Sequence, residues 1–194
     1  MRSNSVVLVV AAYLGFALAL AVPVYAADAT EKVSDEWVGF SLAVPKPWVR
    51  SALKGYTVPG VLRCAWTGPG GSSLLVFAQE PGAAVDPRSM LDSSAASQRA
   101  NLGVEVLTQE VRTVGKMRAM WLAIKGKGTG GAIDGKGDTE TVQHWVAIPR
   151  EKDVVVLLLT CPAADYERSK ASFSAAVESL KLSGAQTEQQ KASH

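Results

Sequence analysis

The sequence has few of the side chains that enzymes use most often for catalysis. It contains two histidines, His144 and His194, and two cysteines, Cys64 and Cys161, in 194 residues. Catalysis that couples a nucleophile to a histidine would have to use His144, because His194 lies in a polar terminal stretch. No Gly-x-Ser-x-Gly motif is present, and a Cys-His pair would need a reduced thiolate. We therefore interpret His144 as a strand histidine with an ordinary hydrogen bond and predict no catalytic residue.

Motifs for metals and cofactors are also lacking. The two cysteines form no Cys-x-x-Cys, which zinc sites commonly use. Asp134 and Asp138 lie in a glycine-rich segment without the spacing or terminal glutamate of a calcium loop. The glycines at 126–131 precede a polar stretch and a strand, whereas a phosphate-binding loop needs a helix directly after it. We predict no metal and no cofactor.

Neither sign of charge predominates in the chain. It has 20 lysines and arginines against 18 aspartates and glutamates, a formal net charge of +2, and no run of like charge. A surface this close to neutral has no electrostatic basis for attracting a polyanion. We therefore predict no nucleic-acid partner.

The first 26 residues have the pattern of a secretory signal peptide. Arg2 precedes an apolar run at 6–22, followed by Pro23 and a small-x-small site that ends at Ala26. Cleavage after Ala26 predicts a secreted or periplasmic protein. The alternative is an uncleaved anchor, because about 17 apolar residues is near the shortest length that spans a bilayer. Membrane attachment is expected only in that case, since no cysteine for lipid attachment lies near the cleavage point.

Export changes how the two cysteines are interpreted. In an oxidising compartment, Cys64 and Cys161 are the only pair that can form an intramolecular disulfide. A bridge across a loop of about 100 residues would add about 4–5 kcal/mol in the chain-entropy model. We hypothesise this structural disulfide. The alternative is two buried thiols that act as small hydrophobes.

Hydrophobic periodicity predicts a chain of strands interrupted by two helices. Asp86 and Pro87 mark the start of the first helix and Gly103 its end, and a mobile glycine loop is expected at 126–137. The run at 154–160 is apolar throughout, as expected for a central strand covered on both faces. The strands are predicted at 39–44, 61–66, 73–78, 104–114, 117–125, 141–148 and 154–160, and the helices at 87–102 and from about 165.

These elements predict an α+β fold. Short connections favour a central antiparallel sheet of about six to seven strands, flanked by two main helices as an α/β/α sandwich. The expected organisation is a signal peptide at 1–26, a lead-in at 27–36, a single domain at 37–182 and a disordered polar tail at 183–194.

Three stretches carry a resemblance to a known family. They are GFSLAVPKPW at 39–48, the turn VGKMRA at 114–119, and a last helix with Tyr166, Phe173 and Val177 followed by SLKL at 179–182. In this order the chain resembles the PsbP-like α/β/α sandwich superfamily, which includes DcrB-type bacterial exported proteins of unknown function. The resemblance spans about residues 37–182. It implies an accessory or binding module without shared catalytic residues.

The aromatic side chains suggest one binding surface. Trp37 and Trp48 flank the first predicted strand and Tyr56 lies in the next loop, so together they would form an aromatic binding rim. The alternative is that they cap an open edge of the core.

The sequence as a whole predicts an exported, non-catalytic binding or accessory domain with an unknown protein partner in the envelope. Two alternatives remain open at this point. One is a small secreted hydrolase with an acidic site that converges only in the fold. The other is an envelope protein tethered by an uncleaved N-terminal helix.

Overall fold

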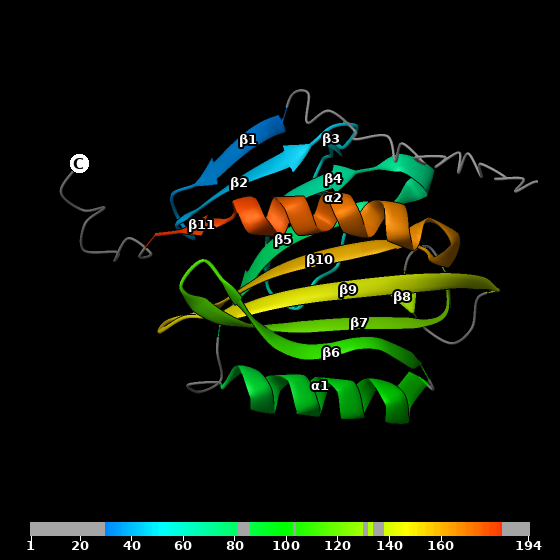
Figure 1. The fold of residues 1–194 in the computed structure, drawn as a ribbon. Helices are drawn as coiled ribbons and strands as arrows, with labels where there is room; N and C mark the ends of the chain where they lie inside the picture. Colours follow the sequence, from blue (N-terminus) through cyan, green and yellow to red (C-terminus); the bar gives the residue numbers. More distant parts are fainter. Residues whose placement is uncertain (1–29, 81–85, 103, 130–131, 134–137, 184–194) are drawn as a thin grey trace, which may run out of the picture.

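A computed structural model describes residues 30–80, 86–102, 104–129, 132–133 and 138–183. The predicted signal peptide at 1–26 and all but the first residue of the predicted tail at 183–194 lie outside these ranges. Within these ranges the chain forms eleven strands and two α-helices, arranged as Figure 1 shows. The strands are β1 (Thr30–Asp35), β2 (Phe40–Pro45), β3 (Val49–Arg50), β4 (Val61–Thr67), β5 (Ser73–Gln79), β6 (Glu105–Val114), β7 (Met117–Thr129), β8 (Ala132–Ile133), β9 (Thr139–Pro149), β10 (Val154–Pro162) and β11 (Lys181–Leu182); the helices are α1 (Pro87–Leu102) and α2 (Tyr166–Ser179).

The strands form two antiparallel sheets. The main sheet has the order β3-β4-β5-β10-β9-β7-β6, with β8 paired to β7. The small sheet has the order β1-β2-β11. One helix lies on each side of the main sheet (Figure 1), which confirms the predicted α+β sandwich. The small sheet was not predicted.

Two hydrophobic cores lie on the two faces of the main sheet. Phe173, Ala176 and Val177 of α2 pack into the first core together with the small sheet. Leu91 and Ala95 of α1 pack into the second core. The central strand β10 contributes to both, and it is buried from Val154 to Cys161, as its continuous apolar sequence predicts.

The predicted start of α1 is confirmed in detail. The Asp86 carboxylate accepts hydrogen bonds from the backbone N–H groups of Arg88 and Ser89, each at 3.0 Å. These are two of the N–H groups that have no partner within a helix. Pro87 occupies the first helical position, where its missing N–H is not needed.

The glycine loop was predicted at 126–137, but its first four residues belong to a strand. Strand β7 continues through Gly126 and Gly128 to Thr129, and Gly126 is paired with Thr141 of β9. A Cβ added to Gly126 would lie 2.6 Å from the Cγ2 atom of Ile133, so the bare glycine admits close packing on the α1 side. Residues 130–131 and 134–137 of this segment, which include Asp134, lie outside the described ranges.

The predicted lead-in at 27–36 contains a strand that the sequence did not predict. Residues 30–35 form β1, which pairs along its length with β2, from Thr30 opposite Pro45 to Asp35 opposite Phe40. Only Val33 of this strand is buried. A single apolar residue gives no alternation to detect, and tertiary pairing decides the conformation.

None of the helices in the described ranges is long and apolar enough to cross a membrane.

Candidate functional site

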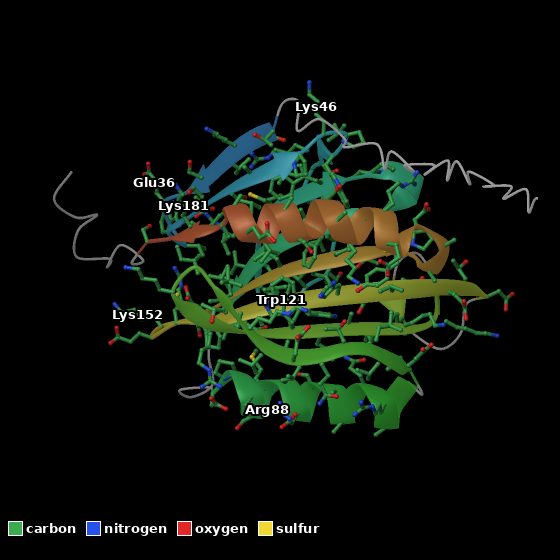
Figure 2. The ribbon with its side chains drawn as sticks, viewed as in Figure 1. Glu36, Lys46, Arg88, Trp121, Lys152 and Lys181 are labelled. Atoms are coloured by element: carbon green, nitrogen blue, oxygen red, sulfur yellow. The ribbon has the colours of Figure 1, made fainter. Side chains whose placement is uncertain are left out.

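The most unusual polar groups lie on the α2 side of the main sheet, where β6, β7 and β9 run together. Alternate residues of a strand point to the same face. This alternation places His144 in a row with Val142 and Val146, all part of the core beneath α2. Trp121 of β7 is paired with Val146, two residues from His144. Trp121 and His144 are therefore diagonal neighbours on one face, and Figure 2 labels Trp121 on the sheet below α2 in that view.

Four rings meet at this position, and we call Trp121, His144, Tyr166 and Phe173 the histidine cluster. The His144 ring centroid lies 5.0 Å from that of Phe173, 5.6 Å from that of Trp121 and 6.1 Å from that of Tyr166. Phe173 and Tyr166 come from α2. The cluster therefore joins the sheet to the helix, and both sides contribute aromatic surface.

Two nitrogen atoms of the cluster are buried without a partner. His144 is 2% exposed and Trp121 is 6% exposed. The Nδ1 atom of His144 lies 3.3 Å from the Tyr166 hydroxyl. The Nε2 atom of His144 and the Nε1 atom of Trp121 have no hydrogen-bond partner within the described part of the chain. Buried polar groups without partners are rare because each one loses its hydrogen bonds to water.

The cluster is electrically neutral near pH 7. Burial, together with the charges of Lys170 and Arg112, lowers the pKa of His144 to about 4. Burial also raises the pKa of Tyr166 to about 12, with Glu167 and Cys161 adding to the effect and a hydrogen bond from the Thr108 side chain opposing it. The imidazole and the phenol therefore both stay uncharged at neutral pH.

Charged side chains form a rim over the cluster. The Arg112 guanidinium lies 5.1 Å from the centroid of the Trp121 ring and pairs with Glu110 at 2.6 Å. The Lys170 ammonium lies 5.4 Å from the centroid of the Tyr166 ring, a distance at which cation–π attraction acts. Lys170 also lies 3.7 Å from a Glu167 oxygen. The floor of the site is thus aromatic with unused nitrogens, and its rim holds two partly exposed ion pairs.

The predicted aromatic rim does not form. Trp37 is 63% exposed, whereas Trp48 is 6% exposed and belongs to the core under α2. A Cβ added to Gly68 would lie 2.7 Å from the Trp48 ring, which shows how tightly this ring is packed. Tyr56 packs against the other core, on the α1 side. The three residues lie within about 20 positions of one another in sequence, but the main sheet separates Trp48 from Tyr56.

The predicted disulfide is also absent, because Cys64 and Cys161 are both free and buried. Cys64 is paired with Val76 of β5, and Val76 with Leu157 of β10, four residues before Cys161. Two strand spacings of about 4.8 Å and four residues of about 3.3 Å separate the cysteines by roughly 16 Å. A disulfide needs Cα atoms about 4.4–6.8 Å apart, so this sheet register cannot form the bridge.

Cys161 and His144 lie near each other but are not a catalytic pair. Cys161 is opposite Val142, so it lies diagonally from His144. Burial raises the pKa of the Cys161 thiol to about 11, and a hydrogen bond with Ser169 opposes the rise only in part. A nucleophilic thiolate beside an imidazolium needs the opposite shifts, a low thiol pKa and a protonated histidine. The two side chains therefore have the protonation states of core residues.

No other part of the described residues offers a better candidate for a binding or catalytic site. They contain no group of three or more histidine, cysteine, aspartate or glutamate side chains placed to hold a metal ion. An open hollow beside the start of α1 has a volume of about 700 Å³ and is lined in part by Asp86, Arg118 and Arg150. Arg118 pairs with Asp86 at 3.5 Å. The Nε and Nη2 atoms of Arg150 both donate hydrogen bonds to the Asp153 carboxylate. Asp86, Arg118 and Arg150 are therefore already paired.

The chain has no match among family models and none among curated protein sequences. Solved structures do match. LpqN of Mycobacterium tuberculosis, described as involved in cell envelope biogenesis, has a TM-score of 0.55 at 15% identity over 80% of this chain and 91% of that chain. PsbP (CyanoP) of Synechocystis sp. PCC 6803 has a TM-score of 0.52 at 14% identity over 79% and 92%.

A third similar structure is the Ran-binding protein Mog1p of Saccharomyces cerevisiae. Its TM-score is 0.54 at 12% identity, over 79% of this chain and 95% of that chain. Identities this low show a shared fold and nothing finer. The resemblance expected from the three sequence stretches is therefore confirmed as a resemblance of fold.

Proposed function

We propose that this chain, which has the PsbP-like fold, is a non-catalytic binding or accessory domain that acts in the cell envelope or after secretion. The observation that carries the proposal is the histidine cluster with its rim. Two buried nitrogens, Trp121 Nε1 and His144 Nε2, lack partners within the described residues. A buried polar group without a partner calls for an explanation, and a ligand or partner that completes its hydrogen bonds is one that fits both nitrogens.

The protonation states of the cluster favour binding over acid–base catalysis. An efficient general base has a pKa near the working pH, whereas that of His144 is about 4. The two carboxylates of the rim, Glu110 and Glu167, are each paired with a cation. The arrangement supplies fixed donors and aromatic surface, which recognition requires and proton transfer does not.

The roles of two of the similar proteins support the same proposal. One is a Ran-binding protein and another is involved in cell envelope biogenesis. At these identities, neither the binding partner of one protein nor the pathway of the other can be assigned to this chain. An envelope or secreted location rests on the predicted signal peptide, and intact-mass analysis of the protein from cell fractions tests it. A mature chain that begins at Ala27 supports export with cleavage, and retention of residues 1–26 in the membrane fraction supports the tethered alternative.

Site-specific photo-crosslinking in the producing cell tests binding at the cluster. A photo-reactive phenylalanine analogue replaces Glu110 at the rim, and in a matched variant it replaces Ala96, an exposed residue of α1 on the other side of the sheet. We expect one reproducible crosslinked protein from position 110 and none from position 96. The same products from both positions, or none from position 110, would contradict binding at this face.

A further inference from the structure

We infer that the histidine cluster is a binding site for a carboxylate, which accepts hydrogen bonds from the Trp121 Nε1–H and His144 Nε2–H groups. The inference rests on the proposed binding function and deepens it by naming the chemistry of the ligand. Both side chains are more than nine-tenths buried, and both nitrogens lack a partner within the described ranges.

The first step concerns the proton on His144. Its Nδ1 atom lies 3.3 Å from the Tyr166 hydroxyl, and only one of the two atoms can donate in this hydrogen bond. A phenol is the better donor and a neutral imidazole nitrogen is the better acceptor. Tyr166 therefore donates to Nδ1, and the imidazole carries its own proton on Nε2.

The second step concerns what can satisfy two donors. The indole nitrogen of Trp121 is a donor only, and Nε2–H of a neutral imidazole is a donor as well. Both belong to rings whose centroids lie 5.6 Å apart. A ligand that satisfies both must therefore offer two acceptor positions, on one atom or on two neighbouring atoms. A carboxylate does this with its two oxygens, and hydrogen bonds to a charged oxygen are stronger than those to a neutral one.

The third step concerns charge and entry. Arg112 lies over the Trp121 ring, and its side chain is 55% exposed. Its pairing with Glu110 is an exposed ion pair, a class that contributes little stability. The guanidinium can therefore leave the indole, let a carboxylate reach the buried nitrogens and pair with the ligand in place of Glu110. Lys170 on the other side of the cluster adds a second positive charge.

Titration of ¹⁵N-labelled protein, followed by NMR, tests the inference. The probes are sodium acetate, the peptide acetyl-Ala-Glu-Ala-amide and, as neutral controls, acetamide and the matching glutamine peptide. We expect saturable shifts of the Trp121 indole N–H with both carboxylates and none with either amide. Tighter binding of the glutamate peptide than of acetate identifies a partner side chain as the source, and equal binding identifies a small free acid.

Variants locate the binding. Trp121→Phe removes the donor and keeps a ring, so we expect its affinity to fall at least about tenfold, as loss of one hydrogen bond to a charged group predicts. Trp145→Phe is the matched control, because Trp145 faces the α1 side and should bind as the wild type does. Glu110 is partly exposed and pairs with Arg112. Glu110→Gln therefore frees the guanidinium and removes a negative charge that repels the carboxylate ligand. It should tighten binding several-fold and remains informative if Trp121→Phe does not fold.

Three results would overturn the inference. They are equal shifts with acetate and acetamide, unchanged affinity in Glu110→Gln, and ¹⁵N shifts that place the proton of His144 on Nδ1. The last result would make Nε2 an acceptor and a buried water the better occupant. A crosslinked partner with no response to carboxylates would overturn only the ligand chemistry, whereas a response to carboxylates without a crosslinked partner would overturn only the proposed protein-binding role.

Discussion

Acidification should destabilise this protein through one side chain, His144. Its pKa is about 4 in the folded protein and about 6.5 in an unfolded chain, because burial disfavours the imidazolium. Between these two values the unfolded state binds more protons, so the free energy of unfolding falls as the pH falls. The contribution is fully present above pH 6.5 and is lost as the pH drops to about 4. At about 1.4 kcal/mol per pKa unit, the loss is roughly 3 kcal/mol.

Urea unfolding of the wild type and of His144→Gln, followed by tryptophan fluorescence, measures this loss. Glutamine is polar but does not titrate, so subtracting the two stabilities at each pH removes the contributions of other groups. We expect the stability difference, wild type minus variant, to fall by about 3 kcal/mol between pH 7 and pH 4. A difference that stays constant over this range would refute the assignment of a buried, neutral imidazole, as would an NMR titration that gives His144 a pKa near 6.5.

Three further predictions concern the rest of the fold. Thiol titration of the denatured, unreduced protein should find both Cys64 and Cys161 free, and the native protein should react slowly because both are buried; a disulfide would contradict the sheet register. Asp35→Asn should lower the free energy of unfolding by about 2 kcal/mol, since that carboxylate accepts from Arg63 at 2.7 Å, and an unchanged urea midpoint would show that the pair contributes nothing. Gly126→Ala should cost about 1–3 kcal/mol, because its methyl group would overlap the core on the α1 side, and a melting temperature equal to that of wild type would contradict this packing.

Local signals were enough to predict both helices and the longer strands, although not which sheet each strand joins. The alternation of Phe40, Leu42 and Val44 predicts β2, and the Asp86 cap marks the start of α1. The small sheet could not be predicted, because β1 has one buried residue and β11 has two residues in total. Pairing between distant segments is decided by the packed fold and leaves little trace in short windows of sequence.

The candidate site shows the same limit. Alternation places His144 on the face of Val142 and Val146, and helical spacing places Tyr166 on the inner face of the last helix. Nothing in either pattern says that the two side chains meet, because their contact depends on where α2 docks on the sheet. The disulfide hypothesis failed for a related reason: export permits a disulfide, but strand register decides which cysteines are neighbours.

The pairing of β2 with β11 has a consequence for the order of folding. Phe40 lies opposite Leu182, and α2 covers the buried face of β2, so strands near the start of the fold depend on its last elements. During synthesis or export from the N-terminus, β1 and β2 emerge first and can pair with each other, but the other edge of β2 and its buried face have no partner until α2 and residue 182 have followed. Closing such a large loop is slow compared with forming the hairpins of the main sheet. We therefore expect the first segment of this domain to be among the last to acquire its native structure.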